Sequence, residues 1–123
     1  MKRILIVDDN KDIVDMMKEY LEKKGYEVTG VIDSTEFPIA IAKEKFHLII
    51  LDIAMPDMDG YEVCERLKAN EETAKIPIML LTGKELEPDG IAQRCLDLGA
   101  ESHLLKSVGT EVILGKIQEL IGS

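Results

Sequence analysis

Five polar side chains of this sequence each stand at the end of a short apolar run, and their types suit one kind of chemistry. They are Asp8, Asp9, Asp52, Thr82 and Lys106. Two carboxylates about 4 Å apart repel by about 4 kcal/mol at an effective dielectric of about 20, and one lysine offsets only part of that energy. If these residues meet, either a carboxylate takes up a proton or a cation binds among them. Carboxylate oxygens with water nearby suit Mg²⁺, or Mn²⁺, in octahedral coordination.

A cation beside a lysine is suited to phosphoryl transfer. The cation and Lys106 would neutralise charge on the moving phosphoryl group, and a carboxylate would be the nucleophile. The Thr82 hydroxyl would donate a hydrogen bond to a phosphoryl oxygen. Each residue taken alone has an ordinary explanation. Asp9 or Asn10 could cap a helix, and Asp52 could open a turn. Phosphoryl chemistry is therefore predicted only if the five residues converge.

Convergence follows from the order of the predicted secondary structure. Five short apolar runs alternate with amphipathic segments, as in a parallel sheet covered by helices on both faces. The predicted strands cover residues 4–7, 26–31, 47–51, 78–81 and 102–105. The predicted helices cover about 12–24, from a cap at Ser34 or Thr35 to about 45, 61–69, from Pro88 to Gly99, and 110–121. Ligands bind outside the carboxyl ends of such strands, which is where the five residues would stand.

Two further expectations concern burial. The apolar face of the first helix is predicted to hold residues at the spacing i, i+3, i+4, i+7 and i+8, namely Ile13, Met16, Met17, Tyr20 and Leu21. Cys64 and Cys95 lie far apart, in no metal-ligand spacing, at apolar positions of predicted helices. They are expected to be small buried hydrophobic residues.

The composition indicates one globular domain over residues 1–123 with an aliphatic core. Apolar residues make up 46%, charged residues 32%, and the formal net charge is -9. So acidic a domain is a poor direct binder of nucleic acid or of anionic membranes, because such binding needs Lys and Arg. The N-terminal apolar run, residues 4–7, ends in two aspartates, which is not the pattern of a signal peptide or a membrane span. The expected location is the cytoplasm.

Motifs distributed over the whole chain point to a family. They are Asp8-Asp9, the run Asp52-Ile53-Ala54-Met55-Pro56-Asp57-Met58-Asp59-Gly60, Thr82 and Lys106, each after its predicted strand. In order and spacing they resemble the response-regulator receiver domain of two-component signalling, and the run after the aspartate is specific. The resemblance implies an α/β, flavodoxin-like (βα)5 fold, doubly wound around a five-stranded parallel sheet of order 2-1-3-4-5, as in chemotaxis regulators.

The resemblance also implies how the site would bind its metal and its phosphoryl group. Asp52 would be the phosphoacceptor, and Thr82 and Lys106 would contact the phosphoryl group. The family pattern places a Mg²⁺ or Mn²⁺ ion on a small set of oxygen ligands. These would be the side chains of Asp9 and Asp52, the backbone carbonyl of Ala54 and, mainly through water, Asp8.

The partners are implied by the same resemblance. The phosphoryl donor would be a phosphohistidine of a sensor histidine kinase or of a phosphotransfer protein. Thr82 would then swing inward, with His103 at the position of a rotating ring, and the changed surface would bind a downstream protein or a fused effector. The domain would hydrolyse its aspartyl phosphate slowly. It would be a signalling phosphoacceptor that catalyses only its own phosphorylation and dephosphorylation, without direct contact to nucleic acid or membrane.

Three positions depart from the family pattern. His103 replaces the usual Tyr or Phe of the fifth strand, which leaves either a plain ring replacement or a group that titrates near neutrality. Ser107 replaces the usual Pro after Lys106. Because a cis bond without proline costs about 2.5–4 kcal/mol, a trans bond is expected there. Ala54 and Lys84, two residues after the phosphoacceptor and the threonine, stand at positions that control water access in this family.

Three alternatives stay open. A degenerate receiver would act as an unphosphorylated protein-interaction module; it ranks below the active switch because all five core residues are present, and the departures near Lys106 keep it open. A haloacid-dehalogenase-like phosphatase also uses a strand-end aspartate, but it needs a second aspartate where this chain has Ala54, and normally a longer chain. A flavodoxin-like electron carrier would need a Ser/Thr/Gly-rich loop after the first strand, and here Asp8-Asp9-Asn10 would repel a phosphate.

Overall fold

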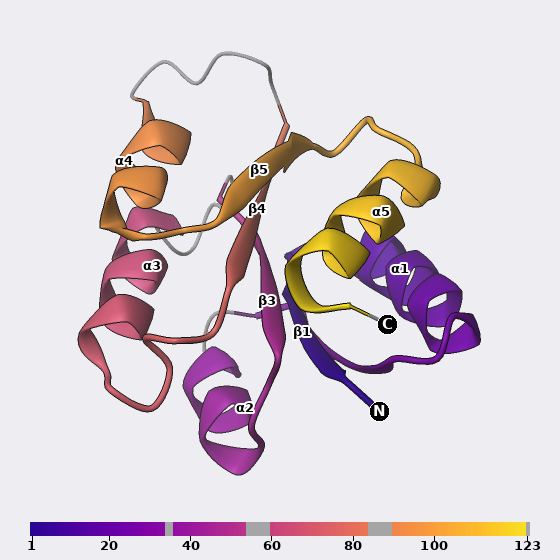
Figure 1. Cartoon of the computed structure of the whole chain (residues 1–123), viewed down its shortest axis with the longest axis horizontal. Helices are drawn as coiled ribbons and strands as arrows, with labels where there is room; N and C mark the ends of the chain where they lie inside the picture. The colour runs from indigo at the N-terminus through magenta and orange to yellow at the C-terminus, as the bar shows by residue number, and fades with distance from the viewer. Residues whose placement is uncertain (34–35, 54–59, 84–89, 123) are drawn as a thin grey trace.

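Five parallel strands form the centre of the chain (Figure 1). The computed structural model describes residues 1–33, 36–53, 60–83 and 90–122. The strands are β1 (Arg3–Val7), β2 (Glu27–Val31), β3 (Leu48–Asp52), β4 (Ile78–Thr82) and β5 (Ser102–Leu105). Their order is β2-β1-β3-β4-β5, and every neighbouring pair is parallel. The predicted fold class and the strand order 2-1-3-4-5 are therefore confirmed.

Helices cover both faces of this sheet. They are α1 (Lys11–Lys23), α2 (Phe37–Lys43), α3 (Gly60–Ala69), α4 (Ile91–Leu98) and α5 (Thr110–Ile121). Figure 1 shows α1 and α5 together on one face and α2, α3 and α4 on the other. Each face has its own apolar cluster, and the sheet separates the two. No helix of the described segments has the length and hydropathy needed to cross a membrane.

The central strands β1, β3 and β4 are buried on both faces, as their unbroken apolar sequences require. Successive side chains of a strand point to opposite faces. In β1, Ile4 and Ile6 pack in the cluster of α1 and α5, whereas Leu5 and Val7 pack in the other cluster. Each such aliphatic side chain contributes about 1.5–3 kcal/mol when fully buried. Both predicted buried cysteines are found in the core, on α3 and α4.

The first helix is rotated relative to its predicted face. Its buried side chains are Val14, Met17 and Leu21, and Met16 is 51% exposed, so the prediction that Met16 packs in the core is wrong. The cause lies in β2. A Cβ atom added to Gly30 would lie 2.4 Å from Val14 Cγ1, so only glycine lets the helix dock this closely on its Val14 side. The helical period alone does not show which of two adjoining apolar stripes faces the sheet.

The remaining differences from the predicted elements are small. The second helix is shorter than predicted: α2 starts after Glu36, which forms no side-chain cap, and Pro38 lies in its first turn as expected. The proposed caps Ser34 and Thr35, like Pro88, lie outside the described residues. β2 and β3 begin one residue later than predicted, and β3 and β4 each include the polar residue at their end. Gly99 ends α4 as predicted, in a left-handed conformation with φ 119° that favours glycine.

Candidate functional site

The carboxyl ends of the strands bring the predicted site residues to one edge of the sheet. β1 and β3 run in register, so Asp8, the first residue after β1, lies beside Asp52, the last residue of β3. Thr82 ends the next strand, β4, and is 2% exposed. The backbone N–H of Lys106 donates a 2.8 Å hydrogen bond to the Thr82 carbonyl, which fixes the start of the β5–α5 loop against this edge.

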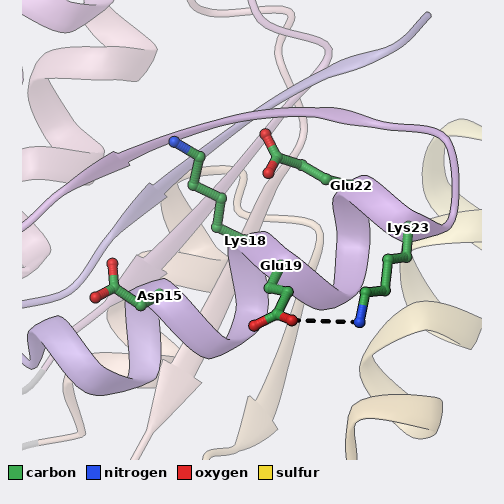
Figure 2. A pocket seen from close by; sticks show the side chains of 5 residues that line it. All are labelled: Asp15, Lys18, Glu19, Glu22 and Lys23. Carbon is green, nitrogen blue, oxygen red and sulfur yellow. Dashed lines mark hydrogen bonds and ion pairs between the residues drawn. The ribbon is translucent and has the colours of Figure 1, made fainter.

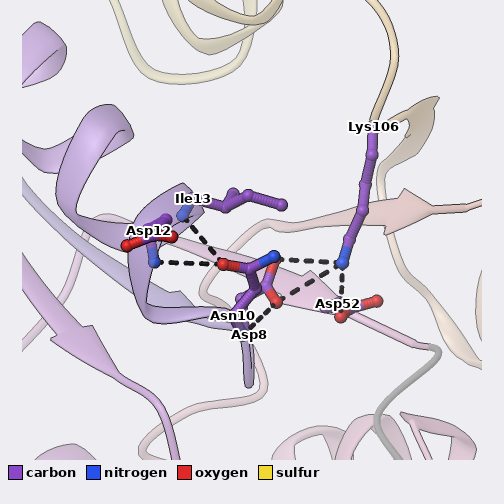
Figure 3. Close-up of polar contacts among 6 residues, drawn as sticks. All are labelled: Asp8, Asn10, Asp12, Ile13, Asp52 and Lys106. Atoms are coloured by element: carbon purple, nitrogen blue, oxygen red, sulfur yellow. Dashed lines mark hydrogen bonds and ion pairs between the residues drawn. The ribbon is translucent and has the colours of Figure 1, made fainter.

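Lys106 reaches both buried carboxylates (Figure 3). Its Nζ lies 2.7 Å from Asp52 Oδ2 and 3.2 Å from Asp8 Oδ2, and both carboxylate side chains are 1% exposed. No described peptide bond is cis, so the bond between Lys106 and Ser107 is trans, as expected without proline. The lysine nevertheless contacts the aspartates, so the departure at Ser107 does not remove its amine from the site.

Asp8 has one oxygen satisfied and one not. The Asn10 backbone N–H donates a 3.0 Å hydrogen bond to Oδ1. Oδ2 is buried and accepts no hydrogen bond from the described residues, although Lys106 Nζ lies within ion-pair distance of it. Burial raises the pKa of Asp8 to about 6. The charge of Asp52 adds to this effect, and the Asn10 N–H and Lys106 oppose it. A buried acceptor without a hydrogen bond costs about 1–3 kcal/mol, so a ligand on this atom would be stabilising.

Lys106 remains charged in these surroundings. Burial alone would lower its pKa, but the hydrogen bond and charge of Asp52, together with Asp8, outweigh burial and raise the pKa of Lys106 above its ordinary value. Among the described residues of this edge, one cation, Lys106, faces three carboxylates, counting the neighbouring Asp9. When all three are ionised, the site therefore carries excess negative charge.

Asp8, Asp9 and Asp52 could hold one metal ion among them. One carboxylate oxygen from each lies within 4.8 Å of the others. Asp9 is exposed, so water has access to this group, and Mg²⁺ usually keeps several waters. An all-oxygen donor set suits Mg²⁺ or Mn²⁺. Because Asp8 Oδ2 lacks a hydrogen bond and the cluster carries excess charge, the residues present fit the predicted ion.

The other predicted site residues are placed unequally. Ala54, Lys84 and most of the specific run, residues 54–59, lie outside the described part of the chain. His103 lies on the edge strand β5 with an exposed side chain, three residues before Lys106. Its role, like the roles of Thr82 and the aspartates, stays a prediction.

Asn10, which the sequence predicts only as a possible helix cap, also contacts the site. Asn10 caps α1 and also holds Asp8 through its backbone N–H. Its place between the aspartate pair and an amphipathic segment suggested the cap. A backbone hydrogen bond to Asp8 has no sequence signal, because it depends on the turn that the chain makes at residues 8–10.

A hollow on the outer face of α1 differs chemically from the site at the strand edge. Figure 2 shows that charged side chains of both signs line the hollow, namely Asp15, Lys18, Glu19, Glu22 and Lys23. The Lys23–Glu19 pair, 3.2 Å apart, is exposed. Exposed pairs one helical turn apart contribute only about 0.3–0.5 kcal/mol. The hollow is an ordinary solvated helix face, so the chemistry is assigned to the strand edge.

Comparison with known proteins agrees with this geometry. Residues 4–118 match a family model described as the response regulator receiver domain. The DNA-binding dual master transcriptional regulator RpaA of Synechocystis sp. is 36% identical over 98% of the chain, which covers 49% of that protein. The chain thus spans about half the length of the curated relatives it matches.

Solved structures of receiver proteins share this fold, and two of them are compared with the chain as follows. The chemotaxis protein CheY4 of Vibrio cholerae superposes with a TM-score of 0.88 and 31% identity, covering 98% of both chains. The receiver domain of the sensor histidine kinase PA1611 of Pseudomonas aeruginosa superposes with a TM-score of 0.85 and 29% identity, covering 99% of this chain and 98% of that one. That structure has a magnesium ion coordinated in its active site cleft.

Proposed function

The chain belongs to the response regulator receiver domain family, and on that basis we propose that it is a phosphoacceptor switch of two-component signalling in which Asp52 takes the phosphoryl group. One observation carries the proposal. The amine of Lys106 lies 2.7 Å from the buried carboxylate of Asp52, next to an Asp8 oxygen without a hydrogen bond. A carboxylate between a fixed ammonium group and a metal-binding position suits phosphoryl transfer, because charge on the transferred group is neutralised from both sides.

In the proposed reaction an Asp52 oxygen attacks the phosphorus of a phosphohistidine. The O–P bond forms as the P–N bond breaks, and the leaving imidazole nitrogen takes up a proton. Lys106 offsets the negative charge of the phosphoryl oxygens, and the Thr82 hydroxyl donates a hydrogen bond to one of them. Attack by water on the acyl phosphate later restores the carboxylate and releases inorganic phosphate. The domain therefore acts on itself, once per cycle, and is not a turnover enzyme.

A divalent cation is part of this proposal. Asp8, Asp9 and Asp52 would hold Mg²⁺ or Mn²⁺, together with the backbone carbonyl of Ala54. When bound, the ion would supply positive charge to the phosphoryl oxygens. The carboxylates would orient it, and burial of Asp8 and Asp52 would strengthen the attraction because water is largely excluded from them.

The proposed donor is a protein, a sensor histidine kinase or a phosphotransfer protein. This proposal rests on the family to which the chain belongs. After phosphorylation, movement of Thr82 and His103 would change the surface offered to a downstream protein or a fused effector.

Direct DNA contact is not proposed for this domain. The full-length relative RpaA is described as DNA-binding, but this chain covers about half of it. A net charge of -9 supports a protein rather than a nucleic acid as the direct partner of this domain. The cytoplasmic location stays a prediction.

The test is the intact mass of the protein after incubation with acetyl phosphate. We expect one added phosphoryl group in the presence of Mg²⁺, none with a chelator, and none in Asp52→Asn. Asp15→Asn removes an exposed carboxylate on α1 and should be phosphorylated like the native chain. A folded native chain that gains no phosphoryl group would contradict the proposal and favour the degenerate interaction module. Multiple turnover on a phosphate ester would instead favour the phosphatase.

A further inference from the structure

Asn10 joins the start of α1 to the metal-binding edge through two different groups (Figure 3). Its side-chain Oδ1 accepts hydrogen bonds from the backbone N–H of Asp12 at 3.0 Å and of Ile13 at 3.3 Å. Its own backbone N–H donates a 3.0 Å hydrogen bond to Asp8 Oδ1. The same residue thus satisfies two free N–H groups in the first turn of the helix and holds a carboxylate of the site.

We propose that Asn10 is a positioning residue for the metal site, because its side-chain cap fixes the backbone N–H that orients Asp8. This inference rests on the proposed function, which supplies the metal. The cap needs an extended backbone at Asn10, where φ is -90° and ψ is 103°, and these angles set the direction of the N–H. Oδ1 of Asp8 accepts hydrogen bonds from the Asn10 N–H and, at 3.4 Å, from Lys106 Nζ, whereas Oδ2 accepts none from the described residues. The cap therefore decides which oxygen remains for a cation.

The two roles of Asn10 differ in how easily water can replace them. Asn10 and Asp12 are exposed, so water can reach the helix start if the side-chain cap is lost. Asp8 is 1% exposed, so water cannot easily replace a partner that has turned away from its carboxylate. Loss of the cap should therefore reduce metal affinity by more than a general loss of stability would.

The experiment measures Mn²⁺ binding to the full chain by electron paramagnetic resonance, where the signal of free Mn²⁺ falls as the ion binds. Asn10→Ala removes the cap and keeps the backbone N–H. We expect about tenfold weaker binding, the lower end of the range for losing a group that orients a metal ligand. Asn10→Ser restores a capping oxygen and should bind within about twofold of the native chain.

Thr73→Ala is the matched control for stability. Thr73 is buried and donates a 2.6 Å hydrogen bond to the Leu67 carbonyl, at the end of α3 away from the site. Its loss should destabilise the fold without changing Mn²⁺ affinity. Melting of each variant, followed by circular dichroism, shows that the three chains are folded at the temperature of the titration.

Each other outcome would overturn the inference in a recognisable way. Native affinity in Asn10→Ala, or an equal loss in Asn10→Ser, would show that the cap does not position Asp8. An equal loss in Thr73→Ala would assign the effect to general stability. Absence of Mn²⁺ binding by the native chain would overturn the metal site itself, and this failure of the proposed function is distinct because it alone affects the unsubstituted protein.

Discussion

Replacement of Asp8 by asparagine should stabilise the metal-free protein at neutral pH. Asp8→Asn keeps an oxygen that can accept the Asn10 N–H, but it removes a buried negative charge beside Asp52. Burial raises the pKa of Asp8 from its ordinary value of 3.8 to about 6 in the folded chain. Because one pKa unit corresponds to about 1.4 kcal/mol, the ionised carboxylate costs the fold at most about 3 kcal/mol. Screening by water at the mouth of the site lowers this to about 1–2 kcal/mol.

Proton linkage determines how the stability gain of Asp8→Asn changes with pH. The folded chain binds the Asp8 proton more tightly than the unfolded chain, so stability from this group is full below about pH 4 and is lost as the pH rises through about 6. Asparagine does not ionise, so Asp8→Asn does not lose stability in this way. The gain in the free energy of unfolding for Asp8→Asn should therefore be near zero at about pH 4 and complete above about pH 6.

The assay is denaturation by urea, followed by far-ultraviolet circular dichroism because the chain has no Trp. It is run with a chelator at several pH values. Asp15→Asn makes the same change of charge at an exposed pair with Lys11 and should alter stability by less than about 1 kcal/mol. Added Mg²⁺ should stabilise the native chain more than Asp8→Asn, because only the native chain keeps all three carboxylates. If Asp8→Asn is no more stable than the native chain at pH 7.5 with chelator, the burial argument is refuted.

Two further substitutions test the charge balance of the site and the docking of α1. Lys106→Met should lower the free energy of unfolding by about 3 kcal/mol at neutral pH with chelator, since it removes the cation that pairs with Asp8 and Asp52, and the loss should shrink in acid. The same denaturation series measures it, and a loss independent of pH would contradict the charge explanation. Gly30→Ala should cost about 1–3 kcal/mol, because the new Cβ would lie 2.4 Å from Val14 Cγ1. Gly115→Ala, in open space on α5, should instead stabilise by up to about 1 kcal/mol in the same measurement, and equal effects at the two glycines would argue against close docking.

The fold could be predicted from the sequence because buried strands and amphipathic helices place their apolar residues in different patterns. Buried parallel strands require unbroken apolar runs, such as Leu48–Asp52 up to its last residue, and the intervening helices require a 3.6-residue spacing. The predictions failed where tertiary contacts choose between equivalent local patterns. Met16 and Val14 both belong to helical stripes, and the close approach at Gly30 selected Val14 for burial.

For Asp8, Asp52 and Lys106, convergence at one edge could be predicted from the sequence, but the hydrogen bonds and ion pairs among them could not. Strand ends of a parallel sheet meet at one edge, so Asp8, Asp52 and Lys106 were expected together from their order alone. The sequence does not show that Lys106 approaches Asp52 more closely than Asp8, or that Asn10 holds one oxygen of Asp8. These contacts depend on side-chain rotamers and on one turn of the backbone, which have no periodic signal.

The buried charges of this edge destabilise the fold unless a ligand binds to them. Replacement of a buried ion pair by well-packed apolar side chains is often neutral or stabilising, so stability gives no reason to keep Asp8, Asp52 and Lys106 together. A ligand shifts a conformational equilibrium only by its different affinity for the two states. A carboxylate oxygen without a hydrogen bond and an excess of negative charge make the ligand-free state unfavourable at neutral pH. In the proposed switch, a cation that relieves them would change the relative energies of the two packings of the domain, and this difference is the energy that a switch needs.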